Sequence, residues 1–285
     1  MSPAAQLATL LLEHLKMAGK PDLDEVCRAL GLRVREKDLV GFEGTLVRSR
    51  TAQKGIIGVK RSVREVSRKR FTVAHEIGHF VIPYHKHLES TCGRAVIDRF
   101  SHDLPRPELE ANEFAAELLL PSKVVRNHFD LRKPSVANIS AVATDFETSL
   151  TTTGWRYLDL TDAPCAMIWS RSGRGIWYRT SDALPLKLPL RDLPFAASVA
   201  GRIFADVETS PGPEEVAADL WFYPSQAERI DLLMEDSISL PNYDAVFTLL
   251  WVVQMQKGAL SEYEEELLPE LDPTEFTLAR EKWPH

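Results

Sequence analysis

The stretch Arg70-Phe-Thr-Val-Ala-His-Glu-Ile-Gly-His-Phe80 contains two histidines four residues apart, with a glutamate directly after the first. Side chains at positions i and i+4 of an α-helix lie one above the other, so His75 and His79 can bind the same small cation. Glu76 is turned by about 100° from His75, which lets its carboxylate reach a water on that cation. Two imidazoles leave room for a third protein ligand and a water, as in metal-dependent hydrolases.

Hydrophobic periodicity predicts a helix around these residues. Apolar and small residues recur at helical spacing, and Pro83 ends the pattern because proline cannot continue a helix. The residues of this face are Phe71, Ala74, Ile77, Gly78, Val81 and Ile82. The alternative is that two ordinary helix histidines match a short motif by chance. A third acidic ligand further along the chain would argue against that alternative.

A second helix is predicted from Glu108 to Leu120, because Pro105-Arg-Pro107 precedes it and Pro121 follows it. Placing its residues at steps of about 100° gives a buried arc on one side. This arc consists of Ala111, Phe114, Ala115, Leu118 and Leu119. Glu108 falls inside the arc and Asn112 at its edge. The other carboxylates fall on the side predicted to face solvent, and they are Glu110, Glu113 and Glu117.

Burial gives Glu108 a reason to bind the metal. A carboxylate buried without a partner is costly, and a cation provides a partner. We therefore predict Glu108 as the third ligand, and Asn112 as a group that holds either Glu108 or a metal-bound histidine. The alternative is an exposed Glu108 in the first helical turn, where the helix dipole favours a negative charge. The ligand set suits Zn²⁺ and also other divalent ions such as Mn²⁺.

The whole chain has the composition of a soluble globular protein. Its 285 residues are 44% apolar and 26% charged, which allows one large core or two to three smaller ones. The net charge of −7 argues against a broad surface for nucleic acids or anionic membranes. Three scattered cysteines indicate reduced thiols, and no apolar run is long enough to span a membrane. Because the apolar run Leu7–Leu12 lacks the basic flank of a signal peptide, we expect a cytoplasmic protein with no membrane partner.

Several polar residues near the two helices keep more than one interpretation. The segment Lys60–Arg70 holds six basic residues without interleaved aromatic ones, so a solvated or ion-paired face is favoured over a nucleic-acid contact. Tyr84, His85 and His102 lie between the helices, and each could donate a hydrogen bond to a developing oxyanion. A second metal site from His85 to Cys92 is disfavoured, because the spacing gives no recognisable ligand set.

Together, the two helical segments resemble the ImmA/IrrE family of metallopeptidases. The resemblance rests on Arg70–His79 and on Glu108-Leu-Glu-Ala-Asn-Glu-Phe-Ala-Ala-Glu-Leu-Leu-Leu-Pro121, and it covers roughly residues 20–125. It implies a zincin-like peptidase domain, in which a small sheet packs against the helix that carries the two histidines. It also implies a gluzincin-like site, with His75, His79 and Glu108 on the metal and Glu76 as the catalytic base.

The resemblance further implies a function. Relatives are regulatory proteases that cleave helix-turn-helix transcriptional repressors, in stress responses or in the control of mobile elements. A protein substrate of that kind is therefore expected for this chain. Two other classes stay open: a DNA-binding transcriptional regulator with a structural metal site, and a binding scaffold with an inactive site. The intact set of His75, Glu76, His79 and Glu108 argues against the inactive scaffold.

The predicted fold class is α+β, in three parts. Residues 1–122 form the peptidase domain, with strands expected at 32–35, 44–47 and 55–59. Residues 123–181 form a helix-turn-helix-like segment with a β-hairpin. Residues 182–285 form a small C-terminal α+β domain of unknown role. Strands in this last part are expected at Leu220–Tyr223, Ile230–Met234, Ser237–Leu240 and Ala245–Val253.

The middle segment has the order of elements found in a winged helix, which makes direct DNA binding a possibility. However, its second helix, Leu150–Leu158, offers only Arg156 as a cation, and Trp155 and Tyr157 are typical of a core. We therefore favour a segment that packs against the peptidase part.

Overall fold

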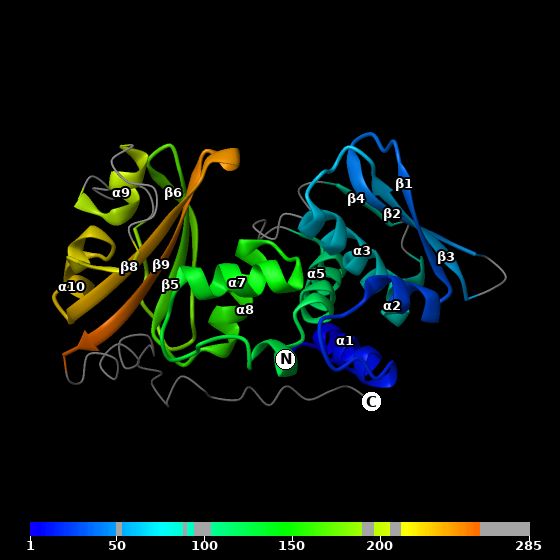
Figure 1. The fold of residues 1–285 in the computed structure, drawn as a ribbon, viewed down its shortest axis with the longest axis horizontal. Helices are drawn as coiled ribbons and strands as arrows, with labels where there is room; N and C mark the ends of the chain where they lie inside the picture. The colour runs from blue at the N-terminus through cyan, green and yellow to red at the C-terminus, as the bar shows by residue number, and fades with distance from the viewer. Residues whose placement is uncertain (50–52, 88–89, 94–103, 190–196, 206–211, 257–285) are drawn as a thin grey trace, which may run out of the picture.

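The structure, a computed structural model, describes residues 1–49, 53–87, 90–93, 104–189, 197–205 and 212–256. It is a mixed α+β protein, which confirms the predicted fold class. Two sheets lie at opposite ends of the molecule, and the helices α7 and α8 lie between them (Figure 1). None of the described helices combines the length and the apolar character that crossing a lipid bilayer requires.

The N-terminal part is a four-stranded sheet covered by helices. The strands are β1 (Leu32–Lys37), β2 (Phe42–Arg48), β3 (Gly55–Lys60) and β4 (Ser90–Gly93). Their order is β1-β3-β2-β4, with β1 parallel to β3 and the other pairs antiparallel. The three strands expected here from the sequence are confirmed. The helices are α1 (Pro3–His14), α2 (Leu23–Ala29), α3 (Val66–Val81) and α5 (Arg106–Leu119), and η1 (Pro83–His87) is a 3₁₀ turn after α3.

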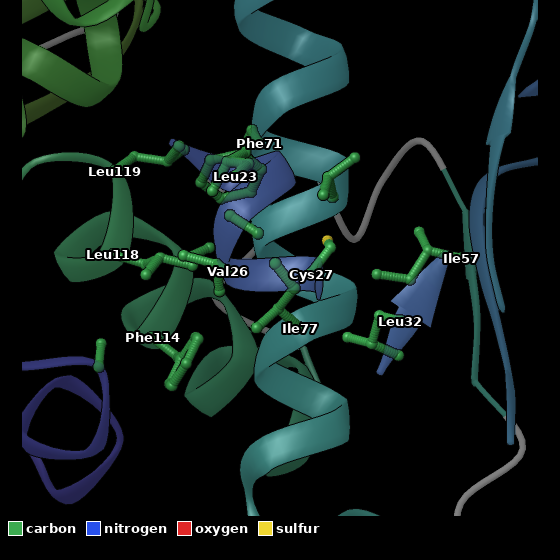
Figure 2. Packing of buried hydrophobic residues seen from close by; sticks show 14 of the residues in the cluster. Leu23, Val26, Cys27, Leu32, Ile57, Phe71, Ile77, Phe114, Leu118 and Leu119 are labelled. Carbon is green, nitrogen blue, oxygen red and sulfur yellow. The ribbon is translucent and has the colours of Figure 1, made fainter. Parts of the chain in front are cut away.

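Helix α3 lies between the sheet and α5, and this position comes from its two apolar sides. Figure 2 shows Ile77 of α3 between the sheet residues Leu32 and Ile57 and the α5 residue Phe114. Gly78 permits close contact of the two helices, because a Cβ atom there would lie 3.1 Å from the ring of Phe114. The helix that carries the two histidines is therefore held from both sides by the same core.

The middle segment contains two helices joined by a tight turn. The elements are α6 (Ser122–Val125), α7 (Val136–Phe146), α8 (Leu150–Leu160) and the hairpin of β5 (Cys165–Arg171) and β6 (Arg174–Thr180). Glu147 ends α7 in a left-handed conformation, and the Ser149 hydroxyl accepts a hydrogen bond at the start of α8. Tyr157 and Leu158 of α8 are buried, and Arg156 forms an ion pair with Glu117 of α5. The packing role favoured from the sequence is thus what the structure has.

The C-terminal strands form one sheet with that hairpin. The elements are α9 (Val199–Phe204), β7 (Glu214–Val216), η3 (Ala218–Leu220), α10 (Pro224–Ala227), β8 (Ile230–Leu240), η4 (Pro241–Tyr243) and β9 (Ala245–Met255). The strand order is β6-β5-β9-β8-β7, antiparallel throughout. This sheet continues across the limit predicted between residues 181 and 182, and the three domain limits themselves stay a prediction.

One predicted strand of this part is wrong, and two others are joined into a single strand. The segment 220–223 is no strand, because η3 ends there and Trp221 and Phe222 pack into the core. The runs 230–234 and 237–240 are one continuous strand, β8. Glu235 and Asp236, which lie between the two predicted runs, are both buried within the strand. Glu235 accepts hydrogen bonds from Ala200 N, Trp221 Nε1 and Ser237 Oγ, which offsets the cost of its burial.

Candidate metal centre

The two histidines of α3 and one glutamate of α5 converge on one point. His75 Nε2 and His79 Nε2 are 3.0 Å apart, and Glu108 Oε2 lies 3.1 Å from the first and 3.3 Å from the second. Both imidazoles are buried, whereas the Glu108 side chain is 19% exposed. The carboxylate therefore lies at the opening of the site, with the two rings behind it.

These three donors fit a divalent cation. Two imidazole nitrogens and one carboxylate oxygen, all within 4.8 Å of one another, are a ligand set that Zn²⁺ and related ions accept. Burial alone would raise the pKa of Glu108. Hydrogen bonds to His75 and His79 outweigh that effect and hold the pKa of this carboxyl well below its usual value. Glu108 is thus ionised near neutral pH, which is the form that binds a cation.

Asn112 lies one helical turn after Glu108 and contacts the back of a histidine. Its Oδ1 is 2.8 Å from His75 Nδ1. An amide oxygen accepts only, so a His75 that binds a cation through Nε2 carries its ring proton on Nδ1 and donates it to Asn112 Oδ1. Of the two roles expected for Asn112, the structure therefore places it behind a histidine.

Glu76 is fully buried beside the metal centre, and strand β2 passes close to it. A Cβ atom added to Gly44 would lie 2.5 Å from Glu76 Oε1 and 2.6 Å from Thr72 Cγ2. Only a glycine lets the strand approach this carboxylate so closely. The position of Glu76 next to His75 in sequence and against β2 in space fixes where its carboxylate can point.

The prediction that Glu110 and Glu117 face solvent is wrong. Glu117 is 1% exposed, accepts a hydrogen bond from Ser122 N at 2.9 Å and pairs with Arg156 at 3.0 Å. Glu110 is 13% exposed and lies 3.1 Å from His85 Nε2. Only Glu113 is exposed as expected. The single buried arc failed because α5 is covered on more than one side, by α3, by α1 and by Arg156 of α8.

His85 is the residue near the site whose role the sequence left open. Its Nδ1 lies 3.1 Å from His79 Nδ1, and its Nε2 contacts Glu110. Because both ring nitrogens have partners inside the protein, His85 offers no donor to an oxyanion. Burial lowers the pKa of His85, and the hydrogen bond to Glu110 opposes part of that shift. Tyr84 is 59% exposed and its hydroxyl forms a hydrogen bond with Glu110, whereas His102 lies outside the described residues.

The basic segment before α3 is an ion-paired face. Arg61 pairs with Asp38 at 2.8 Å, and Arg68 Nε lies 2.6 Å from Glu43 Oε2. Lys69 contacts Glu36. These ion pairs connect α3, and the residues that lead into it, to the N-terminal sheet. They therefore help to position the helix. The interpretation favoured from the sequence is confirmed for these side chains.

Comparison with known proteins identifies the part of the chain that contains this site. Residues 27–156 match the family model described as the IrrE N-terminal-like domain, which belongs to a peptidase family. The match covers a little under half of the chain and includes both α3 and α5. No curated protein matches the chain significantly. The matched domain and the resemblance seen in the sequence agree, and residues 27–156 contain an IrrE N-terminal-like peptidase domain.

Proposed function

We propose that the protein is a cytoplasmic regulatory endopeptidase that uses Zn²⁺, or another divalent ion such as Mn²⁺, to cleave a helix-turn-helix transcriptional repressor. The observation that carries the proposal is the convergence of His75 Nε2, His79 Nε2 and Glu108 Oε2 within a domain of a peptidase family. The repressor as substrate is supported by the resemblance of the two helical segments, and the resemblance makes a protein the expected partner.

The chain's own residues each have a part in the proposed reaction. His75, His79 and Glu108 would hold the cation, which supplies a Lewis acid that polarises the scissile carbonyl and makes a water more acidic. Glu76 accepts the proton of the attacking water and passes it to the leaving amine. Asn112 keeps His75 in the tautomer whose Nε2 can bind a cation.

A DNA-binding regulator with a structural metal site has less support. The cation that its reading helix would offer to DNA is Arg156, and this side chain pairs with Glu117 at 3.0 Å. The neighbouring Tyr157 and Leu158 are buried in the core formed by α7, α8 and the second sheet. Arg156, Tyr157 and Leu158 are therefore held inside the protein and are not arranged for a groove of DNA.

The test compares two variants that separate metal binding from cleavage. Glu76→Gln should keep the metal and lose cleavage by about 10²–10⁴-fold, because the amide cannot accept the proton. His79→Ala should lose both. Metal content is measured by mass spectrometry, and cleavage on gels with a purified repressor encoded beside this gene.

Glu113→Gln is the matched control, because Glu113 is exposed on the same helix as Glu108 and should leave both readouts unchanged. Removal of the metal with a chelator should stop cleavage, and added Zn²⁺ or Mn²⁺ should restore it. Normal cleavage by the Glu76→Gln variant would contradict the mechanism. A metal-loaded protein that leaves every such repressor intact would contradict the proposed substrate class.

A further inference from the structure

A row of four side chains extends away from the back of His79. His79 Nδ1 lies 3.1 Å from His85 Nδ1, and His85 Nε2 lies 3.1 Å from Glu110 Oε2. Glu110 Oε1 in turn accepts a hydrogen bond from Arg106 Nε at 2.9 Å. His85 comes from the turn η1 directly after α3, whereas Glu110 and Arg106 come from the first turns of α5. The row thus joins the two helices that provide the metal ligands.

The positions of the protons in this row follow from the hydrogen-bond partners. If His79 binds a cation through Nε2, its ring proton is on Nδ1, which donates to His85 Nδ1. His85 Nδ1 must then carry a lone pair, so the proton of His85 is on Nε2 and points at the Glu110 carboxylate. A doubly protonated His85 would place two N–H groups against each other at 3.1 Å. The arrangement therefore allows one set of tautomers.

We propose that His85, backed by Glu110, is a positioning residue that holds His79 in its metal-binding tautomer and orientation and so strengthens metal binding. The proposal rests on the proposed function, since it presupposes that His79 is a metal ligand. Partners behind a metal-bound histidine raise the basicity of the ring and fix its direction, and their loss costs about 10–100-fold in metal affinity. The two ligands differ in this respect, because His75 is backed by the neutral amide of Asn112.

The burial of His85 fits the proposed positioning role, and it also fits a histidine that only fills space in the core. His85 is 0% exposed, so its ring is enclosed by the protein and its contacts with His79 and Glu110 are shielded from water. A histidine that merely filled space there could be replaced by an apolar side chain of similar size without effect on metal binding. The experiment has to separate these two roles.

The first experiment measures Zn²⁺ affinity by competition with a chromophoric chelator, which needs no knowledge of the substrate. His85→Leu should weaken Zn²⁺ binding by about 10–100-fold, because His79 loses its acceptor. His85→Gln should restore most of the affinity, since its carbonyl can accept from His79 and its amide can donate to Glu110. Glu113→Gln, the exposed carboxylate one turn further along α5, should bind Zn²⁺ as the natural chain does.

The outcomes distinguish the two proposals. A natural chain that binds no divalent ion would overturn both. A natural chain that binds Zn²⁺, together with a Leu variant that binds it equally well, would overturn only the role of His85. Equal losses in the Leu and Gln variants would also overturn that role, because they would assign the effect to the shape of the ring.

A second measurement uses the unaltered protein and so does not depend on how a variant folds. Long-range ¹H–¹⁵N correlation spectra of the Zn²⁺-loaded protein distinguish the two histidine tautomers. His79 should carry its proton on Nδ1, and His85 on Nε2. A proton on Nδ1 of His85 would overturn the proposal.

Discussion

Gly44 shows how a single missing side chain shapes the site. It allows β2 to pass against Glu76, whose carboxylate would otherwise meet a Cβ atom at 2.5 Å. The proposed metal ligands and the proposed catalytic base therefore depend on different neighbours. His75 and His79 contact the residues behind their rings, whereas Glu76 lies against a strand. Damage to one group need not damage the other.

A Gly44→Ala variant should separate the two groups. The added methyl displaces the Glu76 carboxylate, and a displacement of about 1 Å can cost on the order of 10²-fold in rate. Metal affinity should be unchanged, because the atoms nearest to the added methyl belong to Glu76 and Thr72 and to neither histidine. Gly19→Ala is the control, since a Cβ atom there meets nothing within 4 Å. Normal cleavage by Gly44→Ala would show that the position of Glu76 is unimportant.

The sequence predicted those parts of the site that depend on the spacing of residues within one helix. Spacing within α3 and α5 places His75, His79, Glu108 and Asn112 on faces that meet, and the structure brings these side chains together. It did not predict that His85 contacts His79, because that contact depends on the direction the chain takes after Pro83. No pattern of spacing within one helix encodes that direction.

At the level of whole elements, α5 is the helix that the sequence described least well. A helical wheel assumes one buried side and one solvent-exposed side. Phe114 and Leu118 are buried, as that assumption predicts. Glu117 does not, because the α1 residue Thr9 and the α8 residue Arg156 cover it as well. Its carboxylate joins three helices, so a residue that looks solvent-exposed in sequence connects the peptidase part to the middle segment.

Replacing Arg156 by Met should therefore destabilise the protein. The change leaves the Glu117 charge buried without its cation, and breaking a buried pair in this way costs about 3–5 kcal/mol. The free energy of unfolding in urea measures the effect. Arg126→Met, at an exposed arginine nearby, should change it by no more than about 0.5 kcal/mol. Equal stability of the two variants would show that the ion pair contributes little.

Strands were predicted well where residues alternate and poorly where polar residues are buried. The strands β1, β2 and β3 follow from apolar runs between turns. In β8, the two predicted strands leave out Glu235 and Asp236, although these buried residues belong to one continuous strand. Their hydrogen-bond partners come from elsewhere in the chain: Ala200 N donates to Glu235, and Val136 N donates to Asp236 at 2.8 Å. A sequence does not show such partners.

For the molecule as a whole, Asp236 joins the second sheet to the start of α7. Burial raises the pKa of Asp236, although the hydrogen bond from Val136 N opposes the shift. Because the folded-state pKa lies above the unfolded value of about 3.9, this side chain favours folding most below that value, and the contribution is lost as pH rises through the raised pKa.

Asp236→Asn should remove that dependence while keeping the acceptor for Val136 N. The free energy of unfolding of the variant, relative to the natural protein, should therefore increase as pH rises above about 4. Urea unfolding over a series of pH values measures the difference. Asp231→Asn, at an exposed position of the same strand, controls for the loss of one carboxylate from the strand. A pH-independent difference for Asp236→Asn would contradict the argument.

The central place of β9 in the second sheet has a consequence for how this chain can be divided. Its neighbour β5 comes some eighty residues earlier, and Phe247 and Leu249 of β9 fill the core on which α7 and α8 rest. A shortened chain that kept residues 27–156 and the hairpin, but lost everything after it, would leave β5 without its neighbour β9. The apolar edge of the sheet would then be exposed. The C-terminal strands are therefore needed to complete the second sheet. They can be exchanged between proteins only together with the hairpin of β5 and β6.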